Sequence, residues 1–178
     1  ARVMKQVFDT SGALAGQNFL ISNKPGGDGL IAMSPLTQHK GNAHWMSMLS
    51  SGFLLRQAQG GYKYDIPKDF SIGPILFEET LGVAVREDSP LRSAQDLVEH
   101  LRKDPSAIRI AVAPSLYNHI HVGLLQPLEK AGVATNKLTV AAFRSSAESV
   151  TALLGGHVDV VSASVPNLVA GLKAGNLR

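Results

Sequence analysis

The sequence predicts an α/β protein with a mostly parallel sheet flanked by helices, because a short apolar strand pattern, a polar loop and a helical pattern follow one another three times. The first repeat has a strand at 108–113, a loop at 114–119 and a helix that ends near Gly132. The second repeat comprises residues 138–154, with its loop at 144–146, and the third comprises residues 158–174, with its loop at 162–164. Right-handed crossovers between parallel strands bring the three loops to one edge of the sheet, where such sheets bind ligands.

The residues before these repeats predict a second, incomplete lobe of the same class. The patterns expected there, in order, are a helix at 1–11, a strand at 18–22, a helix at 30–40, a strand at 44–50 and a helix at 52–58. An extended apolar passage at 72–86 leads to a helix with Ser93 as its N-cap, which stops before Pro105. We place the boundary in this passage, with residues 1–82 as the first lobe and residues 83–178 as the second.

Composition limits the class of protein. The 178 residues are 44% hydrophobic and 17% charged, which indicates a globular protein of one or two domains with a real core. We find no run of about 18 apolar residues and no signal-peptide pattern, so we expect neither feature in this chain. The absence of cysteine excludes a disulfide framework and a thiolate nucleophile. Lys and Arg number 17 against 14 Asp and Glu and are scattered singly, which suits an anionic small molecule and not nucleic acid.

Residues 27–32 match the G-x-G-x-x-A form of the dinucleotide fingerprint, between a predicted strand and a predicted helix. That fingerprint also needs an acidic residue about 20 positions later, and residues 48–52 contain none. The glycines fit a close backbone approach better than a nicotinamide site, so we predict no cofactor.

The histidines do not show a metal-ligand pattern. His119 and His121 point to different sides of a helix, and no neighbouring carboxylate completes a zinc site. Ser115 and His121 suggest a nucleophile and a base, but no G-x-S-x-G motif and no orienting acid accompany them. We therefore predict no metal site and no catalytic residue, and the simpler interpretation of His121 is an imidazole that hydrogen-bonds the loop.

Two serine-rich loops predict a site for a carboxylate. Ser145 and Glu148 form a capping-box pattern, which leaves the first amides of the next helix free beside the positive end of its dipole. Residues 50–52 (Ser-Ser-Gly) offer similar donors in the first lobe. The predicted ligand is therefore held mostly by neutral donors, to which Arg144 can add charge.

Motifs along the whole chain resemble the receptors of the tripartite tricarboxylate transporters, also called Bug receptors. The most specific is SSAESVTALLGGHVDVV at 145–161, followed by KAGNLR at 173–178, and NKPGGDG and YDIPKDF add to it. The resemblance implies a type II periplasmic-binding-protein fold, in which two α/β lobes close by a hinge on a small organic carboxylate. It also implies a monomeric, non-enzymatic periplasmic receptor whose partner is a membrane permease. The ligand positions that it implies are Gly27, Ser50, Ser51, Gly52, Ser115, His121, Arg144, Ser145, Ser146 and Ala163.

The chain also departs from that family. Such receptors have a strand and a Pro-Gly-rich loop before the opening helix and continue after KAG-LR, so this chain looks like a fragment that lacks both ends. Ala163 occupies the position that we align with an acidic residue of amino-acid-binding members, which predicts a non-amino carboxylate as ligand. Two other interpretations stay open, namely a nicotinamide-dependent or hydrolytic α/β enzyme and the ligand-sensing domain of a transcription regulator.

Overall fold

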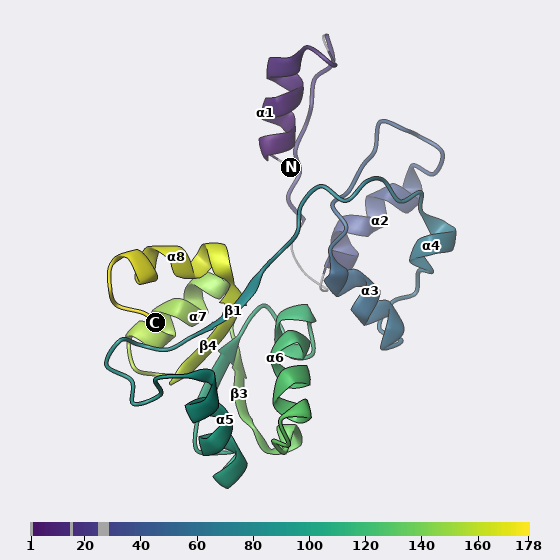
Figure 1. Ribbon diagram of the computed structural model, residues 1–178. Helices are drawn as coiled ribbons and strands as arrows, with labels where there is room; N and C mark the ends of the chain where they lie inside the picture. Colours follow the sequence, from purple (N-terminus) through teal and green to yellow (C-terminus); the bar gives the residue numbers. More distant parts are fainter. Residues whose placement is uncertain (1, 15, 25–28) are drawn as a thin grey trace. The chain divides into compact units, whose positions relative to one another are not determined.

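The structure is a computed structural model, and it describes residues 2–14, 16–24 and 29–178. The chain divides into two compact units, Ala1–Ser71 and Ile72–Arg178, which are described one at a time (Figure 1). Among the described residues, we find no helix with the length and apolar character that a membrane span requires.

The second unit is a single α/β lobe whose described residues form a four-stranded, mostly parallel sheet. The strands lie in the order β1 (Leu81–Ala84), β4 (Val160–Ser164), β2 (Arg109–Val112) and β3 (Thr139–Ala142). β2 is parallel to β3 and β4, whereas β1 is antiparallel to β4, with Leu81 opposite Ser164. The three predicted repeats are thus confirmed. The residues that follow β2, β3 and β4 share one edge of the sheet with residues 79 and 80, and we call it the carboxyl edge.

The predicted boundary between residues 82 and 83 falls inside β1. Because β1 pairs with β4, this strand and the residues just before it belong to the second compact unit. The assignment of residues 1–82 and 83–178 to the two lobes of a receptor stays a prediction.

Helices cover both faces of the sheet in the second unit (Figure 1). The helices are α5 (Ala94–Lys103), α6 (His119–Lys130), α7 (Ser146–Leu154) and α8 (Val165–Lys173), with a short 3₁₀ turn, η2 (Thr135–Lys137). Successive strand residues point to opposite faces. Ile110 packs in the cluster that contains Leu128 of α6, whereas its neighbour Ala111 packs in the cluster that contains Leu153 of α7. The central strands β2 and β4 are therefore buried on both sides, as their near-continuous apolar runs predict, whereas most of β3 is exposed.

Both ends of α5, the first helix of this unit, follow from local sequence signals. Ser93 is the N-cap of α5, where its Oγ accepts a hydrogen bond from the Asp96 amide at 3.1 Å and Asp96 Oδ2 accepts one from the Ser93 amide at 2.9 Å. The helix ends at Lys103, before Pro105. Both ends agree with the sequence prediction.

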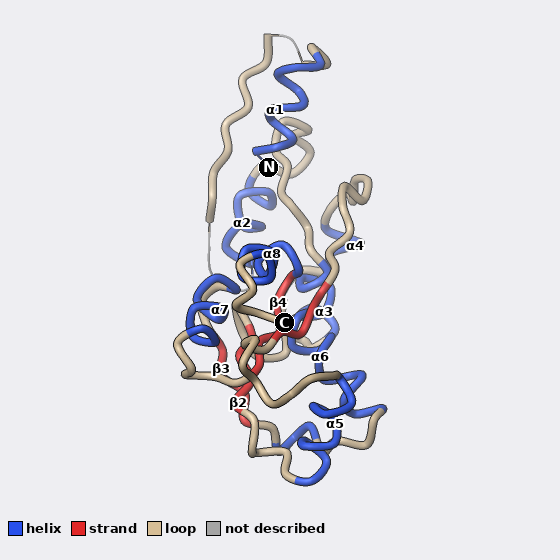
Figure 2. Tube along the Cα trace, turned by 60° about the vertical axis from the view of Figure 1, so that its left-hand side comes forward, coloured by secondary structure: helices blue, strands red, loops and turns tan. Residues whose placement is uncertain are grey.

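The first unit consists of short helices joined by long extended segments (Figure 2). Its helices are α1 (Arg2–Ser11), α2 (Leu30–Gln38), α3 (Ser51–Ala58) and α4 (Ile66–Asp69). The strands predicted at 18–22 and 44–50 do not form, and the described residues of this unit contain no strand. The predicted sheet of the first lobe is therefore wrong for these residues, because a strand forms only where a second segment accepts and donates its backbone hydrogen bonds.

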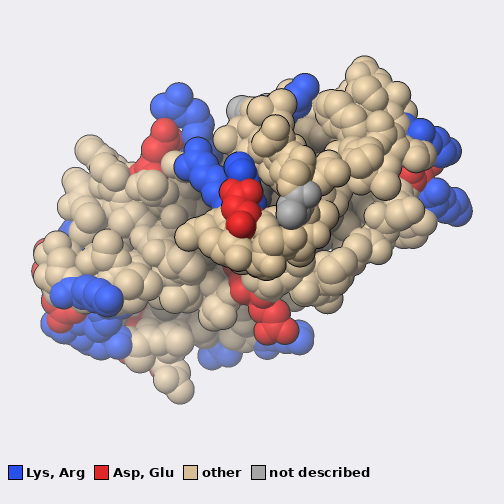
Figure 3. Space-filling view, turned by 90° about the horizontal axis from the view of Figure 1, so that it is seen from above, with Lys and Arg blue, Asp and Glu red and all other residues tan. Residues whose placement is uncertain are grey.

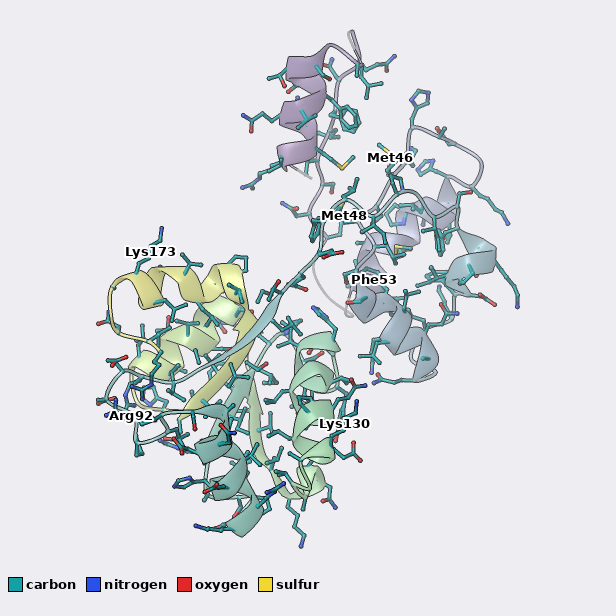
Figure 4. All side chains as sticks on the ribbon, viewed as in Figure 1. Met46, Met48, Phe53, Arg92, Lys130 and Lys173 are labelled. Atoms are coloured by element: carbon teal, nitrogen blue, oxygen red, sulfur yellow. The ribbon has the colours of Figure 1, made fainter. Side chains whose placement is uncertain are left out.

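The buried core of the first unit is small. Met33, Phe53 and Ile66 are its buried hydrophobic residues among those described, while Met46 and Met48 on the segment before α3 are exposed (Figure 4). Leu20 is 94% exposed.

We expect limited proteolysis to cleave the first unit before the second, because local opening costs least where few apolar contacts hold the backbone. Brief trypsin digestion followed by mass spectrometry should leave a fragment of about the size of Ile72–Arg178. Early cleavage within β2, α6 or β4, with the first unit intact, would contradict this expectation.

Candidate functional site

The carboxyl edge of the second unit brings together four of the ten predicted ligand positions. Ser115 lies in the loop between β2 and α6, Arg144 and Ser145 lie in the turn between β3 and α7, and Ser146 is the first residue of α7. β2 and β3 are neighbours in the sheet, so their loops are adjacent. This clustering follows from the parallel topology, as the sequence predicted.

The turn between β3 and α7 presents backbone donors. Ser145 is the N-cap, and its Oγ accepts a hydrogen bond from the Glu148 amide at 3.3 Å. The Glu148 carboxylate accepts one from the Arg144 amide at 3.2 Å and forms an ion pair with the Arg144 guanidinium at 3.1 Å. The predicted return from Glu148 to the Ser145 amide is replaced by this contact with Arg144. The amides of Ser146 and Ala147 belong to the first turn of α7, where an α-helix offers no internal acceptor, so they can bind an anion.

The loop between β2 and α6 is held by Asn118, which the sequence analysis did not single out. This buried residue is the N-cap of α6, and its Oδ1 accepts a hydrogen bond from the His121 amide at 2.9 Å. Its Nδ2 donates to the Ala113 carbonyl at 2.7 Å. Asparagine directly before a helical pattern is an N-cap signal that could have found it. Within the loop, Tyr117 adopts a positive φ of 61°.

His121 is 4% exposed, and burial lowers its pKa below the ordinary value, so the ring is neutral at pH 7. Its Nδ1 accepts a hydrogen bond from the Tyr117 amide at 2.9 Å, which places the proton of the neutral ring on Nε2. The predicted bond between this imidazole and the loop is therefore present. The buried Nε2 has no hydrogen-bond partner among the described residues. A buried N–H without an acceptor costs about 1–3 kcal/mol, so we expect an oxygen atom of a water molecule or of the ligand to accept a hydrogen bond from Nε2.

Glu79 lies at the same edge, and the sequence analysis missed it. One carboxylate oxygen accepts a hydrogen bond from Ser164 Oγ at the end of β4, and the other lies 2.8 Å from His119 Nε2 at the start of α6. The side chain of Glu79 is 37% exposed. We call Glu79, His119 and Ser164 the Glu79 cluster. Glu79 lies here because it comes just before β1, which runs antiparallel to β4, its neighbour in the sheet, and this direction of β1 is not evident from the sequence.

Ala163 is not in a loop. The predicted loop at 162–164 is wrong, because these residues complete β4 by pairing with β1, where Ala163 lies opposite Gly82. Ala163 is fully buried, and it packs in the cluster that contains Leu153 and Leu168. It thus lies on the face of the sheet covered by α7 and α8.

The first unit contains the remaining predicted positions. Ser50 is the N-cap of α3, but its side chain makes no capping hydrogen bond, and its carbonyl accepts one from the Phe53 amide at 3.0 Å. Ser50 and Ser51 are exposed, and Gly52 is partly buried. Gly27 and Asp28, the first two residues of the glycine fingerprint, lie outside the described residues. The role of these positions stays a prediction.

An ion pair between Arg109 and Asp159 connects the start of β2 with the start of β4. Asp159, just before β4, accepts hydrogen bonds from Arg109 Nη2 at 2.7 Å and from Arg109 Nε at 2.9 Å, and this contact with Arg109 lowers the pKa of Asp159. On the face drawn in Figure 3, Lys and Arg lie in small groups beside acidic side chains and not in a continuous stripe. Among the described residues, no group of His, Asp and Glu could hold a metal ion.

Comparison with known proteins identifies the family. The family model described as the tripartite tricarboxylate transporter family receptor matches residues 3–178, so the chain belongs to this family. Membership in a family of receptors favours the receptor interpretation over the enzyme and the transcription regulator. The curated relatives include a UPF0065 protein of the gbd 5' region of Cupriavidus necator, 23% identical over 96% of this chain and 50% of its own length. Another, from the tcbD-tcbE intergenic region of Pseudomonas sp. strain P51, is 25% identical over 100% of this chain and 51% of its own length.

The fold is similar to that of solved solute-binding proteins. MatC of Rhodopseudomonas palustris with bound malate superimposes with a TM-score of 0.77 at 18% identity, over 99% of this chain and 60% of MatC. A second R. palustris protein, solved with adipate, gives 0.73 at 20% identity over 99% of this chain and 58% of its own. A TctC solute-binding protein from Polaromonas gives 0.72 at 22% identity, over 98% of this chain and 58% of that one. The chain therefore has the fold of part of these proteins, and it spans about half the length of its curated relatives.

Proposed function

We propose that this chain belongs to a periplasmic receptor that captures a small organic carboxylate between two α/β lobes and delivers it to a membrane permease. Family membership and the fold shared with proteins solved with malate and adipate support this proposal. The receptor acts as a monomer without a cofactor, and closure of the lobes about a hinge retains the ligand.

The turn between β3 and α7 carries the proposal. The first amides of α7 lie at the N-terminus of the helix, where the helix dipole is equivalent to about half an elementary positive charge. Arg144, just before the N-cap, is exposed. A carboxylate oxygen can accept from these amides and from the hydroxyl of Ser146. The second carboxylate oxygen, or a bridging water, can reach the other donors of the carboxyl edge, such as Ser115 and His121 Nε2.

The first lobe contributes the opposing donors. Ser50, Ser51 and Gly52 lie at the N-terminus of α3, and the hydroxyl of Ser50 is not used in capping that helix. Gly27 completes the first-lobe set as a close-approach position. In this scheme residues 1–82 and 83–178 supply the two sides of one ligand site.

We expect titration calorimetry with succinate, malate and adipate to detect binding of at least one acid. Ser146→Ala should weaken it by about 1 kcal/mol, which is about five-fold in Kd, because one hydrogen bond to the ligand is lost. The affinity should vary little with salt concentration, since most of the donors are neutral. Ser71→Ala is the matched control, because it makes the same change at an exposed serine, the last residue of the first unit, and it should leave Kd unchanged.

Two outcomes would contradict the proposal in different ways. If none of the three acids binds, the proposal that this protein is a carboxylate receptor is wrong. If an acid binds and Ser146→Ala does not change its Kd, the receptor proposal stands, but the turn before α7 is not part of the ligand site.

A further inference from the structure

The ends of β2 and β3 form the topological switch point of the sheet, because the segments that follow these two neighbouring strands leave the sheet on opposite faces. α6, which follows β2, packs on one face with Ile110, and α7, which follows β3, packs on the other face with Ala111 (Figure 1). Open α/β sheets bind ligands at such a point, between the two diverging loops. The loop between β2 and α6 is therefore the neighbour of the α7 turn across which a bound carboxylate extends.

Two hydrogen bonds tie the loop between β2 and α6 to the end of β3. The Val112 carbonyl accepts one from the Phe143 amide at 2.9 Å, so the two strands leave the sheet side by side. The carbonyl of the next residue, Ala113, accepts the other from Asn118 Nδ2 at 2.7 Å, which folds the loop back on its own start. Residues 114–117 thus begin and end beside the strand end that leads into the turn at Ser145.

Tyr117 in this loop combines a strained backbone with an exposed ring. Its φ of 61° is left-handed, and among the described residues it is the only positive φ outside glycine. This conformation costs a tyrosine free energy that a glycine would not lose. Tyr117 is 58% exposed, with its ring centroid 5.4 Å from that of His121. Packing within the chain repays little of the backbone cost, and an outlier of this kind indicates a functional role.

We propose that Tyr117 is a specificity-determining residue whose ring packs against the apolar body of the ligand, next to the carboxylate held by the α7 turn. This inference rests on the proposed function, because it concerns the same carboxylate site. It assigns the ligand to carboxylic acids with an extended chain of apolar carbons, in contrast to short acids.

The composition and anchoring of the loop favour an apolar contact. Leu116, the preceding residue, is 40% exposed, so the loop presents two neighbouring large side chains with apolar surface. Ligand sites combine such a lining with a few polar groups that fix the orientation of the ligand, and the α7 turn supplies those groups. The Tyr117 amide donates to His121 Nδ1 at 2.9 Å, which holds the backbone from which the ring projects. Less conformational entropy is therefore lost when the ligand binds.

Succinate and adipate test the inference, because both carry two carboxylates and adipate has two more methylene groups between them. Complete burial of two methylene groups would raise the affinity about 15-fold. The ring of Tyr117 covers one side of the ligand, so we expect adipate to bind about five-fold more tightly than succinate. Calorimetry on the full chain, with both acids titrated into one preparation, measures this ratio.

Three variants assign the preference to the ring. Tyr117→Asn removes the ring but keeps a residue that readily adopts left-handed backbone, and it should bring the two affinities close to each other. Tyr117→Phe keeps the ring without the hydroxyl and should keep the preference for adipate. Leu172→Asn is the control, because it removes a partly exposed apolar side chain near the C-terminal end of α8, away from the carboxyl edge. It should also keep the preference.

The melting temperature separates this role from a structural one. Because the ring is largely exposed, Tyr117→Asn should lower Tm by less than about 5 °C. A larger fall would overturn this inference, as would equal affinities for the two acids, a ratio unchanged in Tyr117→Asn, or a preference lost in either of the other variants. These outcomes leave the carboxylate receptor intact, whereas failure of every acid to bind would overturn both proposals.

Discussion

Replacement of Leu153 by alanine is expected to lower the free energy of unfolding of the second unit by about 2–5 kcal/mol. Leu153 lies on α7 and is 0% exposed, in a cluster with Val161 and Leu168 beneath the sheet. The truncation removes apolar contacts and leaves a cavity that its tightly packed neighbours fill only in part. Urea unfolding followed by circular dichroism, to which the sheet and helices of this unit contribute together with the helices of the first unit, measures the loss.

Leu154→Ala is the matched control, because it makes the same change at the next residue of the same helix. Leu154 is 44% exposed, so its truncation should cost less than about 1 kcal/mol. Equal losses in the two variants would contradict the buried position of Leu153. The same pair of variants tests the proposed ligand site, since α7 positions the turn at Ser145 and Ser146 against the sheet.

The repeats of the second unit could be predicted from sequence because their signals are local. Each strand is a short apolar run, each helix has an apolar stripe, and a glycine follows each helix. The N-caps at Ser93 and Ser145 could be predicted for the same reason, since a side chain that accepts a hydrogen bond from the amide three residues later needs no distant partner. Parallel topology then placed Ser115 and Ser145 at the same edge without further information.

Local signals of this kind could not show whether strands form in the first unit. Residues 18–22 and 44–50 have apolar strand patterns, yet they remain unpaired extended segments among the described residues. A strand pattern indicates that a segment can form a strand if a suitable partner lies beside it, because the backbone hydrogen bonds of a strand are made to another segment. No local signal shows whether that partner is present.

The Glu79 cluster was missed for a related reason. Glu79 and Ser164 are brought together by the antiparallel pairing of β1 with β4, between segments far apart in the sequence. The passage at 72–86 was correctly seen as extended, but its direction in the sheet was not. Ser162–Ser164 was mistaken for a loop because serine and alanine are weak strand formers, whereas pairing with β1 keeps these residues in β4.

Replacement of Gly29 by alanine is expected to destabilise the first unit by about 2–5 kcal/mol, which combines two costs. Gly29 precedes α2 with a φ of 91°, a conformation that costs a residue with a side chain about 1–2 kcal/mol. A Cβ at this position would lie 2.1 Å from Cζ of Phe53, so the buried ring must move, and such overpacking costs about 1–3 kcal/mol more.

Gly41→Ala separates these costs, because Gly41 has a φ of 81° but no atom within 4 Å of the position of its Cβ. The control should show only the backbone cost. Trp45, the single tryptophan of the chain, lies in the first unit, so its fluorescence during urea unfolding reports on this unit. If both variants lose the same stability, packing against Phe53 is not what requires glycine at position 29. A larger loss in Gly29→Ala would give that glycine of the fingerprint a structural role, with no need for a phosphate ligand to explain it.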